Sequence, residues 1–426
     1  MQLAVDMNRE TELLKLKNPL SGKIEEGMNM VSVDKAYSLI QAHCHSLESV
    51  NIPLEDSLGF VLSENIYSPL SLPPFPQSAM DGYAMRFSEL RSHDSMDVIG
   101  EIAAGNTWKH PLKPGTAVRI FTGARVPDDA DIVVEQERVD SKDKRIFIQK
   151  EGLAQGANIR KKASQIAEGE LAMEKGEAIG PAAIGFLAAM GISSVSVFYK
   201  PEVAIVVSGD ELQLAGSDLN DGNIYESNSL MLRAALEQTG FKVSYLSLVK
   251  DDDSEIENVF QKYIDKVDAL ILTGGISVGD YDLIRKKLES DQIQKIFYKV
   301  KQKPGKPLWF GLSGKTRIFA LPGNPAAVLT CYYQYVFPAL KKMSGSSELS
   351  LPSGEIPLIH DYSKKIGLAH FLKAFKNDAG VRILDGQESF KLQSYSKANC
   401  IVYIPEDKLN IVEGEKVKVY FLPIIH

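Results

Sequence analysis

The sequence has few cysteines, no long apolar run and no excess of basic residues. Its three cysteines are far apart and odd in number, which rules out a fully paired disulfide framework and suits a reducing compartment. No stretch approaches the roughly 20 apolar residues that a membrane span requires. The net charge of -7 argues against a nucleic-acid-binding protein. We therefore expect a cytoplasmic protein with no nucleic-acid partner and no membrane partner.

Several catalytic and metal-binding motifs are also missing. Gly314-Lys315-Thr316 ends like a P-loop, but Trp309 stands where the earlier glycine is required. The chain has no H-E-x-x-H pair, and its seven histidines show no ligand spacing. These absences exclude a P-loop and argue against a structural zinc site. The first 27 residues are charged without an apolar core, so they are not a signal peptide, and Met28 or Met30 is an alternative start.

The chain does contain enough material for several domains. Its 426 residues are 44% hydrophobic and 24% charged, which is ordinary for a globular protein of about two to four domains. Short apolar runs among prolines and glycines predict small β-domains between residues 52 and 150. Strands alternate with helices from residue 201, and short strands return over residues 354–426. We predict a multidomain α/β plus β fold, with a three-layer α/β domain around a mainly parallel sheet and a C-terminal β-domain.

One segment carries most of the chemical information. The apolar strand expected at Val267–Leu272 leads into Thr273-Gly274-Gly275, and Asp280 and Asp282 precede a helix expected from Leu283 to Leu288. Two adjacent glycines permit positive φ angles and leave no Cβ between backbone N–H groups and an anion. This order is typical of a phosphate and metal site at the carboxyl end of a sheet. The alternative is a tight turn before a solvated, acidic helix start.

Acidic residues recur at two other strand ends. The strand Val203–Val207 is followed by Ser208-Gly209-Asp210-Glu211, and the strand Val243–Val249 by Asp251-Asp252-Asp253. Because the ends of parallel strands converge on one crevice, these carboxylates could bind a hard cation together. The alternative for Asp251 to Asp253 is the start of a helix, where the helix dipole favours acids.

Lysines form the counterpart of these acids. Lys299, Lys301 and Lys303 alternate and so share one face of an expected strand, and Lys306 follows the Pro304-Gly305 turn. The alternative is an edge strand on which lysines discourage aggregation. Another strand leads into Pro322-Gly323-Asn324-Pro325, where Asn324 can cap a helix expected to reach about Met343. Acids for a metal and lysines for oxyanions describe a site for phosphoanhydride chemistry.

A series of ordered motifs connects the pattern to a family. The motifs are Pro73–Ala84, Arg119–Ala124, Val133–Glu137, Asn158–Arg160, Ser208–Leu212, Thr273–Asp282, Lys303–Pro307, Leu321–Pro325, Ala398-Asn399 and Ile404–Glu406. In this order they resemble the molybdopterin molybdenumtransferases, the MoeA and gephyrin E-domain family. The resemblance runs from about residue 31 to the end of the chain.

The resemblance implies a reaction and an assembly. Adenylylated molybdopterin and molybdate bind with a divalent cation, usually Mg2+; the pyrophosphate link is cleaved, AMP leaves, and molybdenum reaches the dithiolene sulfurs. A homodimer is implied, with its active site at the subunit interface, and so are contacts with the molybdopterin adenylyltransferase and downstream cofactor-inserting proteins. The expected divisions are an N-terminal extension (1–30), a discontinuous linker and dimerisation domain (31–72 and 163–200), an inserted β-rich domain (73–162), the α/β domain (201–345) and a C-terminal β-domain (346–426).

The resemblance also implies roles for individual residues. The implied catalytic residues are Asp81, Glu211, Asp282, Lys303 and Lys306. The implied metal ligands are Asp81, Glu211, Asp252, Asp280 and Asp282. The implied substrate-binding residues are Thr122, Gly274, Gly275, Ser277, Pro322, Gly323, Asn324 and Ser389. Two positions depart from the family pattern: Gln165 replaces a charged residue, and Lys373 stands where an arginine is usual and cannot grip an oxyanion in the planar, bidentate manner.

Two other functions fit parts of this pattern. A non-catalytic molybdopterin-binding or scaffolding module of the same fold is disfavoured, because the chain has no long appended interaction linker. A molybdopterin adenylyltransferase would share the α/β domain but leaves residues 31–200 unexplained.

Overall fold

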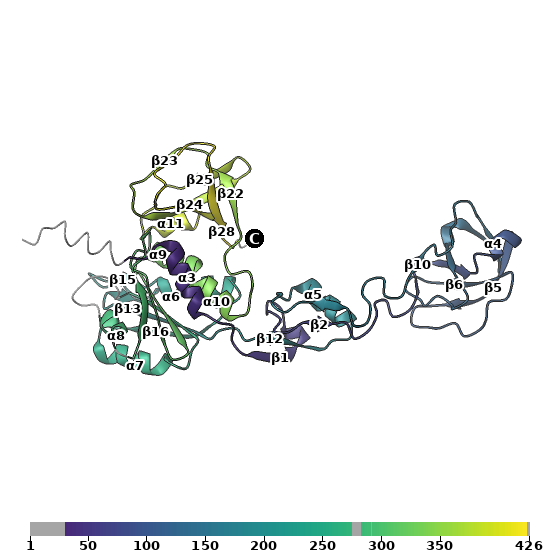
Figure 1. Cartoon of the computed structure of the whole chain (residues 1–426), viewed down its shortest axis with the longest axis horizontal. Coiled ribbons are helices and arrows are strands. Elements are labelled where there is room, and N and C mark those ends of the chain that lie inside the picture. Colours follow the sequence, from purple (N-terminus) through teal and green to yellow (C-terminus); the bar gives the residue numbers. More distant parts are fainter. Residues whose placement is uncertain (1–29, 275–282, 291, 424–426) are drawn as a thin grey trace, which may run out of the picture. The chain divides into compact units, whose positions relative to one another are not determined.

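The structure is a computed structural model that describes residues 30–274, 283–290 and 292–423 (Figure 1). The chain forms two compact units. Unit 1 combines the chain up to Ser49 with everything from Phe198 onward, and unit 2 spans Val50 to Val197. No helix among the described residues has the length and apolar character that crossing a membrane requires. All three cysteines are buried and free.

A six-stranded sheet of order β16-β13-β17-β21-β20-β18 forms the centre of unit 1. Its strands are β13 (Val203–Ser208), β16 (Val243–Val249), β17 (Ala269–Thr273), β18 (Gln294–Tyr298), β20 (Trp309–Ser313) and β21 (Thr316–Leu321). The first four strands of the sheet pair in parallel, and β20 and β18 add an antiparallel edge. The predicted mainly parallel sheet is therefore confirmed.

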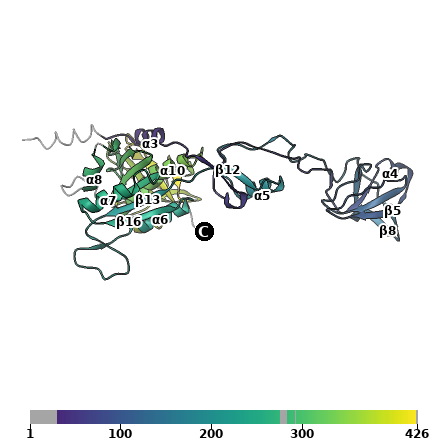
Figure 2. The same ribbon diagram turned by 90° about the horizontal axis from the view of Figure 1, so that it is seen from below.

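Helices cover both faces of this sheet (Figure 2). They are α3 (Val33–His43), α6 (Asn228–Gln238), α7 (Asp253–Tyr263), α8 (Leu283–Leu288), α9 (Pro325–Cys331), a π-helical turn (Tyr332–Val336) and α10 (Phe337–Met343). Alternate residues of β13 point to opposite faces, so Ile205 packs in the core beneath α6 and α9 while Val206 packs in the core beneath α7 and α8. All of β13 is buried, as expected for a central parallel strand. The three-layer prediction is confirmed.

The register of the sheet aligns three strand ends at one edge. Val207 of β13 pairs with Thr273 of β17, and Thr273 pairs with Leu321 of β21. Consequently Ser208, the last residue of β13, lies beside Gly274 and Pro322, which directly follow β17 and β21. A short parallel pair, β14 (Leu212–Gln213) with β15 (Ile224–Tyr225), lies in the connection after β13.

The C-terminal part of unit 1 is a second sheet, of order β19-β24-β26-β28-β22, with β25 paired to β24. Its strands are β19 (Gln302–Lys303), β22 (Ser353–Pro357), β24 (Ala369–Asn377), β25 (Gly380–Ile383), β26 (Cys400–Ile404) and β28 (Lys416–Phe421). A short helix, α11 (Leu392–Tyr395), and the pair β23 (Tyr362–Ser363) with β27 (Asn410–Ile411) complete it. Because β19 comes from the α/β part of the chain, this sheet ties the two parts of unit 1 together.

Unit 2 is built mainly from strands, as the prolines and glycines of that region predicted. Its six-stranded sheet has the order β7-β4-β6-β5-β9-β8. The strands are β4 (Gly82–Met85), β5 (Ser95–Ile102), β6 (Thr116–Ile120), β7 (Ile132–Glu135), β8 (Val139–Lys142) and β9 (Arg145–Ile148). Shorter elements are β1 (Ser49–Pro53), β2 (Ile66–Tyr67), β3 (Gln77–Ser78), β10 (Ile159–Arg160), β11 (Leu171–Met173), β12 (Ser194–Phe198), α4 (Glu89–Ser92) and α5 (Pro181–Ala189).

Candidate active site

A cleft of about 510 Å³ opens at the edge where β13, β17 and β21 end. It is lined by Val207, Ser208, Glu211, Leu212, Ile224, Tyr225, Glu226, Ser227, Asn228, Gly274, Pro307, Pro322, Gly323, Asn324, Pro325 and Phe390. Among the residues predicted from sequence, Glu211, Gly274, Pro322, Gly323 and Asn324 meet here. Its volume falls in the range of about 300–1,000 Å³ that is typical of small-molecule sites.

Gly274 is required by the closeness of two strand ends. Its φ is +89°, and a Cβ built on it would lie 2.1 Å from the carbonyl oxygen of Ser208. An L-residue would be strained by that conformation and would also overlap the neighbouring backbone. Gly323, which follows the neighbouring strand β21, has no such restriction, because its Cβ would come no closer than 3.9 Å to Gly274.

A buried amide joins the strand ends behind the cleft. The side-chain nitrogen of Asn228 donates to Thr273 Oγ1 at 3.1 Å and to the carbonyl oxygen of Gly323 at 2.8 Å. Thr273 in turn donates to the carbonyl oxygen of Pro322 at 3.0 Å. Both amide hydrogens are therefore used, which fixes the orientation of the group, and its oxygen has no partner among the described residues. The local sequence pattern indicates only a helix start at Asn228, so sequence reasoning missed this role.

The acids at this edge differ in their surroundings. Glu211 is exposed in the cleft, whereas Glu226 is buried and accepts hydrogen bonds from the backbone and hydroxyl of Ser229. Asp251 accepts a hydrogen bond from the Ser208 hydroxyl. Of the acids in the cleft wall, Glu211 is thus the one placed to meet a ligand.

Asp252 has a structural role at the start of α7. Its carboxylate accepts from the backbone N–H of Ser254 at 2.9 Å and of Glu255 at 3.1 Å, which caps the helix. Hydrogen bonds, first from the Ser254 side chain and then from these N–H groups, lower the pKa of Asp252 below its usual value. The alternative interpretation of Asp251 to Asp253, a helix start, is what the structure shows; metal binding by Asp252 stays a prediction.

The donor set for a divalent cation is incomplete in the described part of the chain. Within residues 30–274, 283–290 and 292–423, no group of three or more His, Cys, Asp or Glu side chains is placed to hold a metal ion. Glu211 has the oxygen chemistry that Mg2+ prefers but does not suffice alone. The remaining predicted residues of this wall, Gly275, Ser277, Asp280 and Asp282, lie outside the described residues.

The prediction that Lys299, Lys301 and Lys303 share one face of a strand is wrong. Strand β18 ends at Tyr298, and Lys299 adopts a left-handed conformation with φ of 69°. Val300 instead forms a parallel bridge with Val31, so only Lys303 lies in a strand, β19. The following turn is held by buried Gln302, which donates to the carbonyl oxygens of Pro304 and Gly305. Pro307 reaches the cleft, but Lys303 and Lys306 are not among its lining residues.

Ser389 is carried to the start of α9 by a loop of the C-terminal sheet. The side chain of Asn324 donates to Ser389 Oγ at 3.0 Å, and the backbone N–H of Ala326 donates to the carbonyl oxygen of Ser389 at 3.0 Å. Asn324 occupies the N-cap position as predicted, but its side chain makes no capping bond because it is used by Ser389. The neighbouring Phe390 lines the cleft, so this loop forms one of its walls.

Asp81 and Thr122 lie together in unit 2. They are neighbours in space because Gly82 pairs with Ile120 in the antiparallel strands β4 and β6. The carboxylate of Asp81 accepts from the backbone N–H of Thr122 at 2.8 Å and from its hydroxyl at 2.7 Å. These two bonds, in that order, lower the pKa of Asp81 and keep it ionised. The sequence singled out both residues but did not predict the hydrogen bonds that join them, and their roles in a reaction stay predictions.

Comparison with known proteins agrees with the order of these motifs. Three family models match in succession: "MoeA N-terminal region (domain I and II)" over residues 31–191, "Probable molybdopterin binding domain" over 204–342, and "MoeA C-terminal region (domain IV)" over 356–422. The molybdopterin molybdenumtransferase of Haemophilus influenzae is 31% identical over 396 residues, which cover 90% of this chain and 98% of that protein. The chain belongs to the MoeA family.

Other MoeA-family proteins show the same extent of likeness. The molybdopterin molybdenumtransferase 2 of Mycobacterium tuberculosis is 30% identical and covers 92% of this chain and 100% of that protein. The crystal structure of the molybdopterin biosynthesis MoeA protein of Pyrococcus horikoshii OT3 matches with a TM-score of 0.79 at 28% identity, covering 92% of this chain and 100% of that one. The recognition of the family and of its fold from sequence is confirmed.

Proposed function

We propose that this MoeA-family chain is a molybdopterin molybdenumtransferase of molybdenum cofactor biosynthesis. It takes adenylylated molybdopterin and molybdate, joins molybdenum to the two dithiolene sulfurs and releases AMP when the phosphoanhydride bond is cleaved. The observation that carries the proposal is the cleft at the carboxyl edge of the parallel sheet, where Gly274, Gly323 and Glu211 meet in a chain that matches the family along almost its whole length.

The cleft supports a recognition role for its backbone. Gly323 leaves the backbone at the end of β21 open to a flat or phosphorylated ligand, and Gly274 lets the neighbouring ends of β13 and β17 come close together. Asn228 holds these ends in place through Thr273 and Gly323. We propose that the pterin part of the substrate binds against this edge and against Phe390, which also lines the cleft.

The charged residues supply the remaining roles in the proposal. Glu211, with Asp280 and Asp282, acts on the molybdate or on a divalent cation, and Lys303 and Lys306 bind oxyanions. Asp81 takes part in the proposed reaction as an ionised carboxylate that Thr122 orients. Magnesium and a homodimer belong to the proposal through the family resemblance alone.

Variants at the cleft test the proposal. AMP release from adenylylated molybdopterin is measured with molybdate present for the wild type, Glu211→Gln and Asp282→Ala. Both variants should lose AMP release by about 100-fold or more while remaining folded, as expected when a group that stabilises developing charge is removed. Glu237→Gln removes an exposed carboxylate from α6 and should keep full activity. Full activity in Asp282→Ala would remove that residue from the mechanism, and the same holds for Glu211→Gln.

A further inference from the structure

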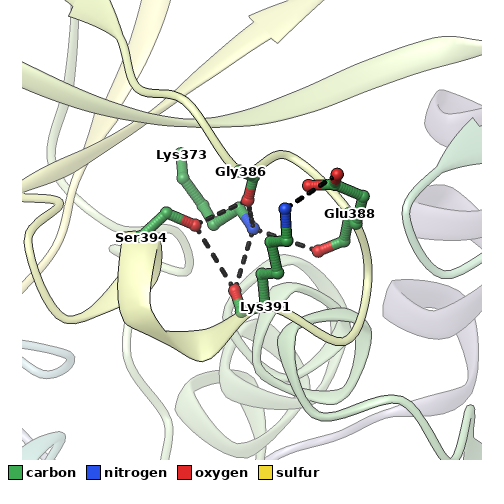
Figure 3. Close-up of polar contacts among 5 residues, drawn as sticks. All are labelled: Lys373, Gly386, Glu388, Lys391 and Ser394. Carbon is green, nitrogen blue, oxygen red and sulfur yellow. Dashed lines mark hydrogen bonds and ion pairs between the residues drawn. The ribbon is translucent and has the colours of Figure 1, made fainter.

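A buried lysine lies beneath the loop that carries Ser389 and Phe390. Lys373, in β24, is 4% exposed. Its ammonium donates to the carbonyl oxygens of Gly386 at 2.6 Å, Lys391 at 3.0 Å and Glu388 at 3.2 Å (Figure 3). An ammonium group has three hydrogens, so these bonds use all its donors. The ammonium is therefore not free to bind an oxyanion, which is the role that the usual arginine at this position had suggested.

The backbone of Lys373 holds the same loop from a second side. Its N–H donates to the side-chain oxygen of Gln387 at 3.0 Å, and its carbonyl oxygen accepts from the Gln387 amide at 2.8 Å. That amide also donates to the carbonyl oxygen of Leu384 at 2.7 Å. Ser394 adds a hydroxyl bond to the Gly386 carbonyl oxygen at 2.7 Å. The loop from residue 384 to 391 is thus wrapped around Lys373.

The far side of the loop faces the cleft. Ser389 accepts hydrogen bonds from Ala326 through its carbonyl oxygen and from Asn324 through its hydroxyl, both at the start of α9. Phe390, next to Ser389, lines the cleft although it is 62% exposed. A wall made by an exposed aromatic residue has little packing of its own to hold it. Its position then depends on the hydrogen bonds that hold the loop, those of Ser389 to the start of α9 and those of Lys373 on the inner side.

We propose that Lys373 is a positioning residue for the substrate cleft. Its ammonium fixes the loop of residues 386–391 in the shape in which Ser389 contacts α9 and Phe390 forms a wall against which the substrate binds. The inference rests on the proposed function for the identity of that substrate. Three carbonyl oxygens that converge on one point are held together by a cation with several donors. Without it, their remaining donors are the Ser394 hydroxyl, which bonds Gly386 and Lys391, and the backbone N–H of Lys391, which bonds Glu388.

The test replaces Lys373 by methionine and by arginine. Methionine keeps the length and apolar stem but has no donor, whereas arginine keeps the charge and can serve several carbonyl oxygens. Lys376→Met makes the same change on the same strand and is the matched control. Two properties are measured in each protein: hydrogen–deuterium exchange of the backbone over residues 384–391, and KM and kcat for AMP release from adenylylated molybdopterin with molybdate.

We expect a specific pattern. In Lys373→Met, hydrogen–deuterium exchange should be faster over residues 384–391 but unchanged over β26. Its KM should rise about 10-fold or more while kcat changes by less than about 3-fold, because a mobile wall weakens contacts that stabilise the bound substrate and the transition state equally. Lys373→Arg should restore most of both properties, and Lys376→Met should match the wild type. If Lys373→Met does not fold, Gln387→Ala loosens the same loop and should shift exchange and KM in the same direction.

Three results would overturn the inference. Unchanged exchange in Lys373→Met means that the ammonium does not hold the loop. Faster exchange with an unchanged KM means that the loop does not position the substrate. A loss confined to kcat means that Lys373 acts on the reaction itself. Absence of AMP release in the wild type instead contradicts the proposed function, and the exchange measurement, which needs no substrate, still decides whether Lys373 holds the loop.

Discussion

Replacing Gly274 by alanine tests whether the closeness of two strand ends sets the shape of the cleft. The residue has φ of +89°, and its Cβ would lie 2.1 Å from the carbonyl oxygen of Ser208. A left-handed conformation costs an L-residue about 1–2 kcal/mol, and relieving overlap in a packed region typically costs about 1–3 kcal/mol. Together these effects predict that Gly274→Ala lowers the free energy of unfolding of unit 1 by about 2–5 kcal/mol.

Gly323→Ala is the matched control in the same cleft. Its Cβ would meet nothing closer than the Cα of Gly274 at 3.9 Å, and its φ is not in the left-handed region. The free energy of unfolding should therefore change by no more than about 0.5 kcal/mol, as for an ordinary exposed position.

The two tryptophans allow the measurement to follow one unit at a time. Trp108 lies in unit 2, and Trp309 lies in β20, in the core that also contains Leu272 of β17. In a Trp108→Phe background, the fluorescence of Trp309 during urea unfolding reports unit 1 alone, which avoids treating a multidomain chain as a single transition. The reasoning is refuted if Gly274→Ala is as stable as the wild type, or if Gly323→Ala is destabilised to the same extent.

Three further predictions concern a buried hydroxyl, a histidine and a carboxylate. Thr273→Val, which leaves buried partners of the Thr273 hydroxyl unpaired, should lower the free energy of unfolding by about 1–3 kcal/mol in the Trp309 assay; an unchanged value would show that the hydroxyl is dispensable. Burial first, and then nearby lysines, lower the pKa of His370 from 6.5 to about 4 in the folded protein. The unfolded chain therefore binds the proton more tightly, and the free energy of unfolding falls as the pH drops from 6.5 to 4. This loss should be about 1–2 kcal/mol after allowance for partial exposure and should disappear in His370→Asn; an equal loss in that variant would assign it to other groups. Thr122→Val should raise the pKa of Asp81, observed by NMR of the carboxyl carbon, and an unshifted pKa would mean that the Thr122 hydroxyl does not stabilise the ionised form.

The strand ends could be predicted from sequence because the patterns that indicate them involve residues close together in the chain. Buried strands appear as runs of β-branched and apolar residues, and Gly274 directly after such a run marks a position that needs a positive φ. The pairing of β13, β17 and β21 then follows from the preference for parallel neighbours in alternating βα chains. This is why the cleft and several of its lining residues could be predicted.

The features that were missed depend on residues far apart in the chain. The lysine pattern suggested one strand, but Val300 is drawn into a bridge with Val31, and the strand breaks at Lys299. The buried role of Asn228 depends on Thr273 and Gly323, which no local pattern connects to it.

The prediction of one helix from the Asn324 cap to about Met343 was also only partly right. It contains a π-helical turn just before α10, whose first turn includes Pro338. Proline lacks the N–H that a continuous α-helix would need there, so the hydrogen-bond pattern changes upstream of it.

The most direct test of the proposed function is whether the purified wild-type chain couples AMP release to molybdenum insertion. The protein is supplied with adenylylated molybdopterin, with and without molybdate, and AMP and pterin-bound molybdenum are measured in the same samples. We predict that molybdate stimulates both and that they form in equal amounts, without ATP. Molybdate-independent AMP formation, no AMP at all, or ATP-dependent adenylylation of molybdopterin would contradict the proposed function.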